Sequence, residues 1–132
     1  MESLKIKTEK RRIGNLGEKL AAKFLKKQGY KILKRNFVAE GAEIDIIARR
    51  KDTVVFAEVK TRSAKEGENL SPASAVTPEK QRKIIKAAKY YAAYNAKDFI
   101  LRLDVIEILL ESKRKRTINH IENAFNINTS RG

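Results

Sequence analysis

Two apolar segments flank the short polar interval Arg50–Asp52, with Glu43–Arg49 before it and Thr53–Thr61 after it. Both segments are rich in β-branched residues, which favour strands, and the interval is short enough for a hairpin turn. Both strands are nearly apolar on both faces, so we expect helices to cover at least part of the sheet that they form. The hairpin therefore predicts a sheet inside an α/β domain.

A first helix is predicted to begin near Asn15 and to end at Gly29. Asn is a favourable N-cap residue, and Glu18 stands three positions later, where a capping-box side chain bonds back to the cap. Glycine is common just past the last helical turn. The basic segment 1–13 is expected to be loosely attached ahead of this helix.

A second helix is predicted to begin at Thr77, which can cap it, with Pro78 at its first position. The polar stretch Arg62–Val76 before it contains Gly and Pro and predicts a long surface loop, a kind of segment that often carries function. The remaining strands are expected at Tyr30–Asn36, Phe99–Leu110 and Thr117–Ile121. This order predicts one central sheet with a helix on one side or on each side, in a single domain over residues 14–125 with a polar tail at 126–132.

Composition narrows the chemistry that such a domain can perform. The 132 residues include no cysteine, which excludes disulfides, cysteine-based zinc sites and thiol catalysis, and the single histidine, His120, is expected at a sheet edge rather than as a ligand. The 30 Lys and Arg residues against 16 Asp and Glu residues leave a net charge of +14, which indicates a polyanionic partner.

No apolar run approaches the roughly 20 residues that span a bilayer. Because residues 1–12 also lack the apolar core of a signal peptide, we expect a cytoplasmic protein outside the membrane.

The predicted hairpin contains charges at positions that are otherwise apolar. Asp45 lies between isoleucines, and Glu58 and Lys60 share one face of the second strand because strand residues alternate. A turn centred on Lys51 and Asp52 places Asp45 opposite Glu58, to within about one or two residues. Opposed carboxylates repel each other, and a divalent cation between them turns that repulsion into a binding site.

Two carboxylates, the backbone carbonyl of Val59 and water are ligands that suit Mg²⁺ or Mn²⁺. Such an ion can activate a water, and Lys60 could orient that water or neutralise charge on a phosphate. The arrangement fits metal-assisted hydrolysis of a phosphodiester. From the residues alone a second interpretation stays open, in which Asp45, Glu58 and Lys60 form a structural ion-pair network on the solvent face of a hairpin.

The spacing of Asp45 and the Glu58-Val59-Lys60 run resembles the active-site signature of the PD-(D/E)xK nuclease superfamily. More closely, the chain resembles the YraN-like proteins, a bacterial family described as endonuclease-like. The matching pieces run from Gly14 to Phe125 and include Gly14-x-x-Gly17-Glu18, Gly29-Tyr30, Arg35-Asn36, Glu43-Ile44-Asp45-Ile46-Ile47, Phe56-x-Glu58-Val59-Lys60-Thr61-Arg62, Ala75-Val76 with Lys80, Asp104-Val105 and Asn123-Ala124-Phe125.

This resemblance implies a restriction-endonuclease-like core, a central mixed β-sheet flanked by α-helices. It also implies one or two Mg²⁺ or Mn²⁺ ions on Asp45 and Glu58, with Lys60 as the catalytic lysine. Glu18 would join them as a helix-borne acid does in Holliday-junction resolvases, or it would serve only the capping box. Glu43 is expected on the same strand face as Asp45.

Basic residues near this site are the expected nucleic-acid contacts, with DNA favoured over RNA and binding that is structure-selective or non-specific. They are Arg11, Arg12, Arg62, Lys65, Lys80, Arg82, Lys83 and Lys86. The tyrosines of the second helix are expected in the core or an interface rather than against bases. A homodimer through the strand Phe99–Leu110 would supply two sites for two DNA strands. The alternatives are a catalytically silent nucleic-acid-binding module and a basic factor on ribosomal RNA.

Overall fold

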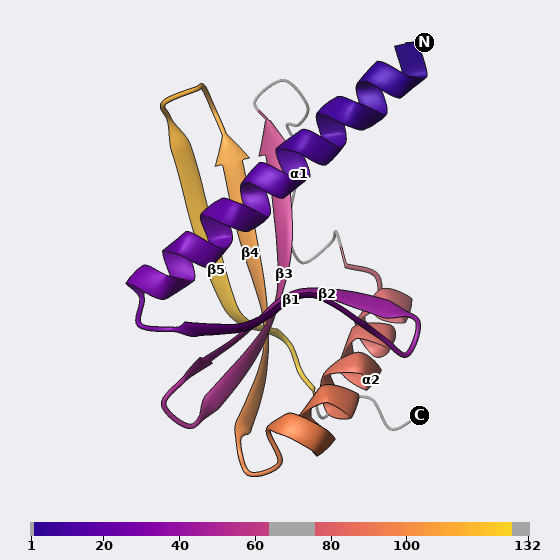
Figure 1. Ribbon diagram of the computed structural model, residues 1–132, viewed down its shortest axis with the longest axis vertical. Helices are drawn as coiled ribbons and strands as arrows, with labels where there is room; N and C mark the ends of the chain where they lie inside the picture. The colour runs from indigo at the N-terminus through magenta and orange to yellow at the C-terminus, as the bar shows by residue number, and fades with distance from the viewer. Residues whose placement is uncertain (1, 64–75, 128–132) are drawn as a thin grey trace.

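The computed structural model describes residues 2–63 and 76–127 and shows a five-stranded mixed sheet with two helices (Figure 1). The strands lie in the order β1-β2-β3-β4-β5, in which only the β3–β4 pair is parallel. The elements are α1 (Glu2–Lys27), β1 (Lys31–Ala39), β2 (Ala42–Arg50), β3 (Thr53–Ser63), α2 (Pro78–Asn95), β4 (Ile100–Leu110) and β5 (Arg116–Phe125). The predicted α/β class and element order are confirmed.

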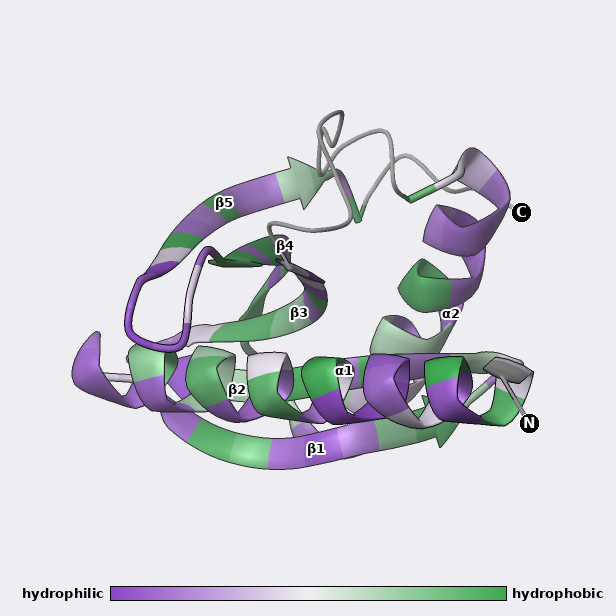
Figure 2. Cartoon of the chain, turned by 90° about the horizontal axis from the view of Figure 1, so that it is seen from above, coloured by the Kyte–Doolittle hydropathy of each residue, from purple (hydrophilic) through white to green (hydrophobic). Residues whose placement is uncertain are grey.

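Each helix covers its own face of the sheet, so the domain has two apolar cores. Ala21 and Leu25 of α1 pack on one face, and Ile84 and Ala88 of α2 pack on the other. In Figure 2 hydrophobic colour runs through β3 and β4, which with β2 are the interior strands of the sheet. Of the two arrangements left open by the sequence, the structure has the one with a helix on each side. No helix in the described part of the chain is long and apolar enough to cross a membrane.

Helix α1 begins far earlier than the sequence predicted. It runs without interruption from Glu2, so Asn15 lies inside it and caps nothing, and residues 2–13 are helical rather than loosely attached. This first part is rich in Lys, Glu and Arg, which have high helix propensity, but Leu4 and Ile6 are exposed because it extends beyond the sheet (Figure 1). The helix ends as predicted, with Gly29 at φ +90° and Tyr30 N–H bonded to Leu25 O.

Helix α1 approaches β3 very closely at Gly17. A Cβ atom at this buried position would collide with the side chain of Thr61, whereas a Cβ at Gly14, one turn earlier, would meet nothing within 4 Å. The absence of a side chain at Gly17 therefore sets how near the helix lies to the strand that carries Glu58 and Lys60.

The hairpin register is confirmed. Strands β2 and β3 pair from Arg50 opposite Thr53 to Ile46 opposite Ala57, the alignment that a turn at Lys51 and Asp52 predicts. Strand β4 lies between β3 and β5 with its middle residues buried, so it is an interior strand and not the free interface that the sequence suggested.

Helix α2 also agrees with its sequence signals. The Thr77 hydroxyl accepts a hydrogen bond from Lys80 N–H, and Pro78 occupies the first turn. The buried residues of the helix are Ile84, Ile85, Ala87, Ala88, Tyr91 and Ala92. Of the loop expected at Arg62–Val76, Arg62 and Ser63 belong to β3, and residues 64–75 lie outside the described part of the chain. In the expected tail, Ile127 packs into the α2-side core.

A buried carboxylate joins β5 to the rest of the sheet. Asp104 of β4 is fully buried and accepts hydrogen bonds from Arg102, the backbone N–H of Asn123 and the ring of His120, the last at 2.7 Å. Arg102 also donates to the Tyr30 hydroxyl at 2.6 Å. His120 therefore lies on an edge strand, as predicted, and helps to hold that strand.

Candidate metal centre

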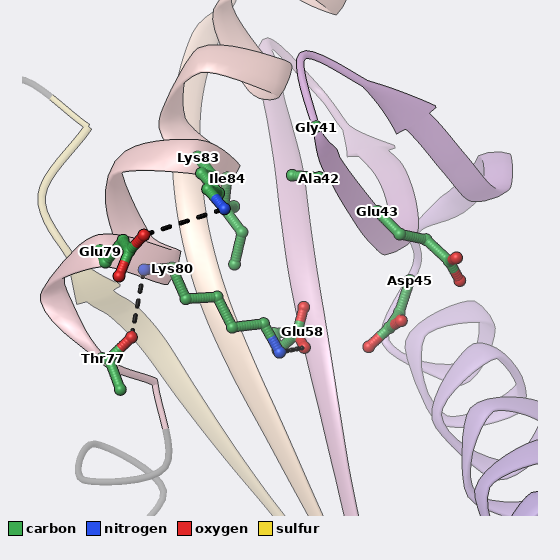
Figure 3. A pocket seen from close by; sticks show the side chains of 10 residues that line it. All are labelled: Gly41, Ala42, Glu43, Asp45, Glu58, Thr77, Glu79, Lys80, Lys83 and Ile84. Carbon is green, nitrogen blue, oxygen red and sulfur yellow. Dashed lines mark hydrogen bonds and ion pairs between the residues drawn. The ribbon is translucent and has the colours of Figure 1, made fainter.

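A cavity of about 540 Å³ opens where β2, β3 and the first turn of α2 meet (Figure 3). Its lining comprises Gly41, Ala42, Glu43, Asp45, Glu58, Thr77, Glu79, Lys80, Lys83 and Ile84. The structure thus brings Asp45 and Glu58, from neighbouring strands, to one cavity on the α2 side of the sheet.

Asp45 lies where the β2–β3 ladder stops. The last paired residues are Ile46 and Ala57, and beyond them the Val59 N–H donates to Asp45 Oδ2 at 2.8 Å instead of to a backbone carbonyl. The pKa of Asp45 is raised to about 7, chiefly by burial and next by the charge of Glu58, while the Val59 hydrogen bond acts in the opposite direction. A carboxyl group with so high a pKa lies in surroundings that favour a cation beside it.

Glu58 is the most deeply buried acid of the cavity, with 7% of its surface exposed. Its Oε1 accepts a hydrogen bond from Lys80 Nζ at 3.0 Å and lies 3.8 Å from Lys60 Nζ. Its Oε2 is buried and has no hydrogen-bond partner among the described residues. An unpaired buried carboxylate oxygen is energetically costly, so this atom points to a group that the chain itself does not supply.

Lys60 shares the Glu58 face of β3, as strand alternation predicted. Burial lowers the pKa of Lys60, and the nearby ammonium of Lys80 lowers it further. Lys80 reaches the same carboxylate from α2, whose first turn is fixed by the Thr77 cap (Figure 3). Burial acts to lower the pKa of Lys80, but its hydrogen bond to Glu58 and the Glu58 charge outweigh burial and raise it.

Glu18 and Glu43 add two more acids at this site, where Glu43 lines the cavity and the charges of both raise the pKa of Asp45. Glu18 Oε1 lies 3.8 Å from Arg35, and the amide orientation of Asn36 that satisfies both contacts donates to Glu18 at 2.8 Å and to Glu43 at 3.2 Å. Asn36 reaches between them from a left-handed backbone position, φ 53°, which Asn tolerates well. The pKa of Glu18 is raised, because the effect of burial outweighs the lowering effect of the Arg35 charge.

These contacts correct one expectation. The capping-box role of Glu18 is wrong, because its helix does not start at Asn15. Glu43 lines the same cavity as Asp45, with its carboxylate turned away from Glu58 (Figure 3). Ile44 and Ile46, two residues apart, pack in opposite cores. The alternation breaks where β2 leaves β3, a separation that the sequence does not reveal.

The donor atoms of the cavity fit a hard cation with few protein ligands. Within residues 2–63 and 76–127, no three His, Cys, Asp or Glu side chains gather closely enough to hold one ion. Two carboxylates, Asp45 and Glu58, would therefore act with backbone oxygen and water, the type of coordination that Mg²⁺ accepts. The N–H and C=O of one strand residue point to the same side, so the Val59 carbonyl faces the same gap as its N–H.

The expected nucleic-acid residues do not form one surface. Arg11 and Arg12 are exposed on α1, where Arg12 pairs with Glu9, while Arg82, Lys83 and Lys86 are exposed on α2, across the sheet. Arg62 is half-buried on β3, and Lys65 lies outside the described residues. Lys80 lies inside the cavity, a position that depends on how α2 packs and was not evident from the lysine-rich sequence.

A family model described as uncharacterised protein family UPF0102 matches residues 17–108. The chain belongs to this family. The match confirms the resemblance to YraN-like proteins, and it contains every residue of the cavity described above.

The curated UPF0102 relatives are similar over nearly their whole length. A UPF0102 protein of Caldanaerobacter subterraneus is 45% identical over 123 residues, covering 90% of this chain and 98% of its own. One from Caldicellulosiruptor saccharolyticus is 46% identical over 119 residues, covering 88% of this chain and 98% of its own. One from Pelobacter propionicus is 46% identical over 122 residues, covering 90% and 86%.

Proposed function

We propose that this UPF0102 chain is a metal-dependent endonuclease that hydrolyses phosphodiester bonds in nucleic acid, with DNA favoured over RNA. One observation carries the proposal: the buried Glu58 carboxylate has an unpartnered oxygen in the cavity that Asp45 also lines. Two acids at this depth are unfavourable unless a cation joins them. The cavity therefore supports a site rather than a structural ion-pair network on a solvent face.

Asp45 and Glu58, with the Val59 carbonyl, would hold Mg²⁺ or Mn²⁺. A bound ion of this kind lowers the pKa of a coordinated water and neutralises charge on a phosphate oxygen. The Val59 N–H fixes the Asp45 carboxylate in place, which leaves its other oxygen available as a ligand. Lys60 is half-buried beside Glu58, where its ammonium can orient a water or stabilise negative charge on the phosphate.

The net charge of +14 supports a polyanionic substrate. Lysines on the first turns of α2 lie at the cavity, where they can contact backbone phosphates without reading base sequence. We therefore propose cleavage that is non-specific or selective for the shape of the substrate.

Closed circular DNA tests the proposal because it has no ends for an exonuclease. We expect nicking in Mg²⁺ or Mn²⁺, its loss in EDTA, and its loss in Asp45→Asn and Lys60→Ala variants that still bind DNA. Asp98→Asn, which changes an exposed acid away from the cavity, is the matched control and should cleave normally. Cleavage that persists in both site variants would show that the activity comes from a contaminant.

A second candidate is a nucleic-acid-binding module with no catalytic activity. The Lys80–Glu58 ion pair favours it, because an ammonium already balances one carboxylate of the cavity. This alternative predicts salt-sensitive DNA binding with no calorimetric signal for Mn²⁺. Comparing DNA junctions, linear duplex and structured RNA at one salt concentration would also identify a ribosomal-RNA factor.

A further inference from the structure

The outer face of α2 carries two lysines followed by two tyrosines. Lys83, Lys86, Tyr90 and Tyr94 follow one another at spacings of three, four and four residues, which place them on one side of a helix. We call these four residues the Lys–Tyr stripe. The stripe begins at the candidate metal centre, because Lys83 lines the cavity that contains Asp45 and Glu58.

The two tyrosines of the stripe are exposed. Tyr90 and Tyr94 have 47% and 75% of their surfaces accessible, and their rings lie 5.3 Å apart, tilted by 54°. Tyr91, between them in sequence, is buried against Phe37 and Phe56. The tyrosines were expected in the core or an interface; Tyr91 is in the core, and Tyr90 and Tyr94 lie outside it.

Every charged side chain of α2 after Glu79 is basic, and the next acid in the sequence is Asp98. No acidic residue occurs in the sequence from Lys80 to Lys97. Glu79 lies just before this stretch, with its Oε1 3.9 Å from Lys83 Nζ, an exposed pair that holds Lys83 only weakly. The surface thus combines cations for phosphate with aromatic rings.

We propose that the Lys–Tyr stripe binds single-stranded nucleic acid and leads it to the candidate metal centre. Lys83 and Lys86 contact the phosphates, and the rings of Tyr90 and Tyr94 stack on unpaired bases. This inference rests on the proposed function only where it says that the strand is led to the metal centre. The binding itself requires neither metal nor cleavage.

An unpaired strand fits this surface better than a duplex. Lysines alone would bind either form, but a tyrosine ring can stack only on a base whose face is free, and a duplex covers those faces. From Lys83 to Tyr94 the helix rises about 16 Å, enough for several nucleotides. A junction, flap or bubble would supply such a segment next to a duplex.

Binding is best measured in EDTA, with fluorescein-labelled oligo(dT) at one fixed salt concentration. We compare wild type with Tyr90→Ala/Tyr94→Ala and with the conservative Tyr90→Phe/Tyr94→Phe variant, which keeps both rings. Both sites are exposed and alanine favours helices, so circular dichroism should show an unchanged fold. The chain has no Trp, so quenching of tyrosine fluorescence in the wild-type protein gives a second readout of binding, with the buried Tyr30 and Tyr91 as background.

We expect the alanine variant to weaken oligo(dT) binding at least about tenfold, because stacking stabilises each base substantially. The phenylalanine variant should bind like wild type, and a blunt-ended linear duplex should bind all three proteins equally. Oligo(rU) in a parallel titration shows whether the strand is DNA or RNA. Unchanged affinity in the alanine variant, equal loss in the phenylalanine variant, or tighter wild-type binding to duplex would overturn the proposal.

The two proposals fail in different ways. Tyrosine-dependent binding without cleavage in Mg²⁺ or Mn²⁺ would contradict the proposed nuclease function and support the proposed role of the Lys–Tyr stripe in binding. Cleavage together with oligo(dT) binding that does not depend on the two tyrosines would contradict the proposed role of the Lys–Tyr stripe and support the nuclease function.

Discussion

The Nζ atom of Lys80 lies 3.0 Å from Oε1 of Glu58, so a side chain of α2 places a positive charge on the buried carboxylate of β3. A metal ion at Glu58 and the Lys80 ammonium would draw on the same negative charge. Lys80 must then weaken its contact, or move, when a cation binds.

Replacing Lys80 should therefore strengthen metal binding. In Lys80→Ala we expect the Mn²⁺ dissociation constant to fall about fivefold, the equivalent of about 1 kcal/mol for a half-exposed charge pair. Calorimetry measures this constant directly, and the rise in Tm on adding Mn²⁺ should be larger than in wild type. Lys83→Ala removes an equal charge from the same cavity without a contact to Glu58, and should change the constant less. Weaker binding in Lys80→Ala would mean that Lys80 supports the site instead.

Asp45 should make the metal-free protein less stable as the pH rises. Its folded pKa of about 7 lies above the ~3.9 of an unfolded Asp, so the folded chain keeps a proton that the unfolded chain loses between those values. Stability contributed in this way is present at about pH 4 and is lost as the pH rises through 7. In EDTA at pH 8, Asp45→Asn should unfold in urea with a free energy on the order of 2 kcal/mol higher than wild type. The difference should vanish near pH 4, and a constant difference would contradict the assignment.

The two glycines of α1 should respond in opposite ways to alanine. Gly17→Ala places a methyl group against Thr61 and should destabilise the fold by about 1–3 kcal/mol, as overpacking does. Gly14→Ala enters open space on the same helix and should stabilise it by about 0.5–1 kcal/mol. Thermal unfolding of both variants measures the contrast, and equal effects would show that α1 does not rest on β3 as described.

Asp104 should be a stability residue rather than a catalytic one. Burial acts to raise the pKa of Asp104, but hydrogen bonds from His120, Arg102 and Asn123 bring it below its usual value. Asp104→Asn should lower the unfolding free energy by about 3–5 kcal/mol at pH 7, because it removes the buried counter-charge of Arg102 and leaves only the exposed Glu122, 3.5 Å away. Asp98→Asn is the exposed control, and a loss below about 1 kcal/mol for Asp104 would mean that the network contributes little.

The sequence predicted the hairpin well because its information is local. The turn at Lys51–Asp52 fixes the register, and strand alternation then puts Glu58 and Lys60 on one face. The start of α1 was missed because residues 2–13 have high helix propensity but no buried stripe that marks them as a helix.

The other misses concern contacts between distant segments. Lys80 could be placed on α2 from the Thr77-Pro78 signal, but its reach to Glu58 depends on how the helix packs against the sheet. The bond from Asn36 to Glu18 depends likewise on where α1 crosses β1. Neither distance is encoded in spacing along the chain.

The short connection at Lys51–Asp52 has a consequence for how the hairpin can change over evolution. Adding a single residue there would slip β3 by one position and turn Glu58 and Lys60 under α1, with Val59 and Thr61 facing the cavity in their place. Adding two would restore the faces but move the acid about 7 Å along the strand, away from Asp45. The length of this surface turn thus decides whether the carboxylates of Asp45 and Glu58, which come from two different strands, can bind the same ligand.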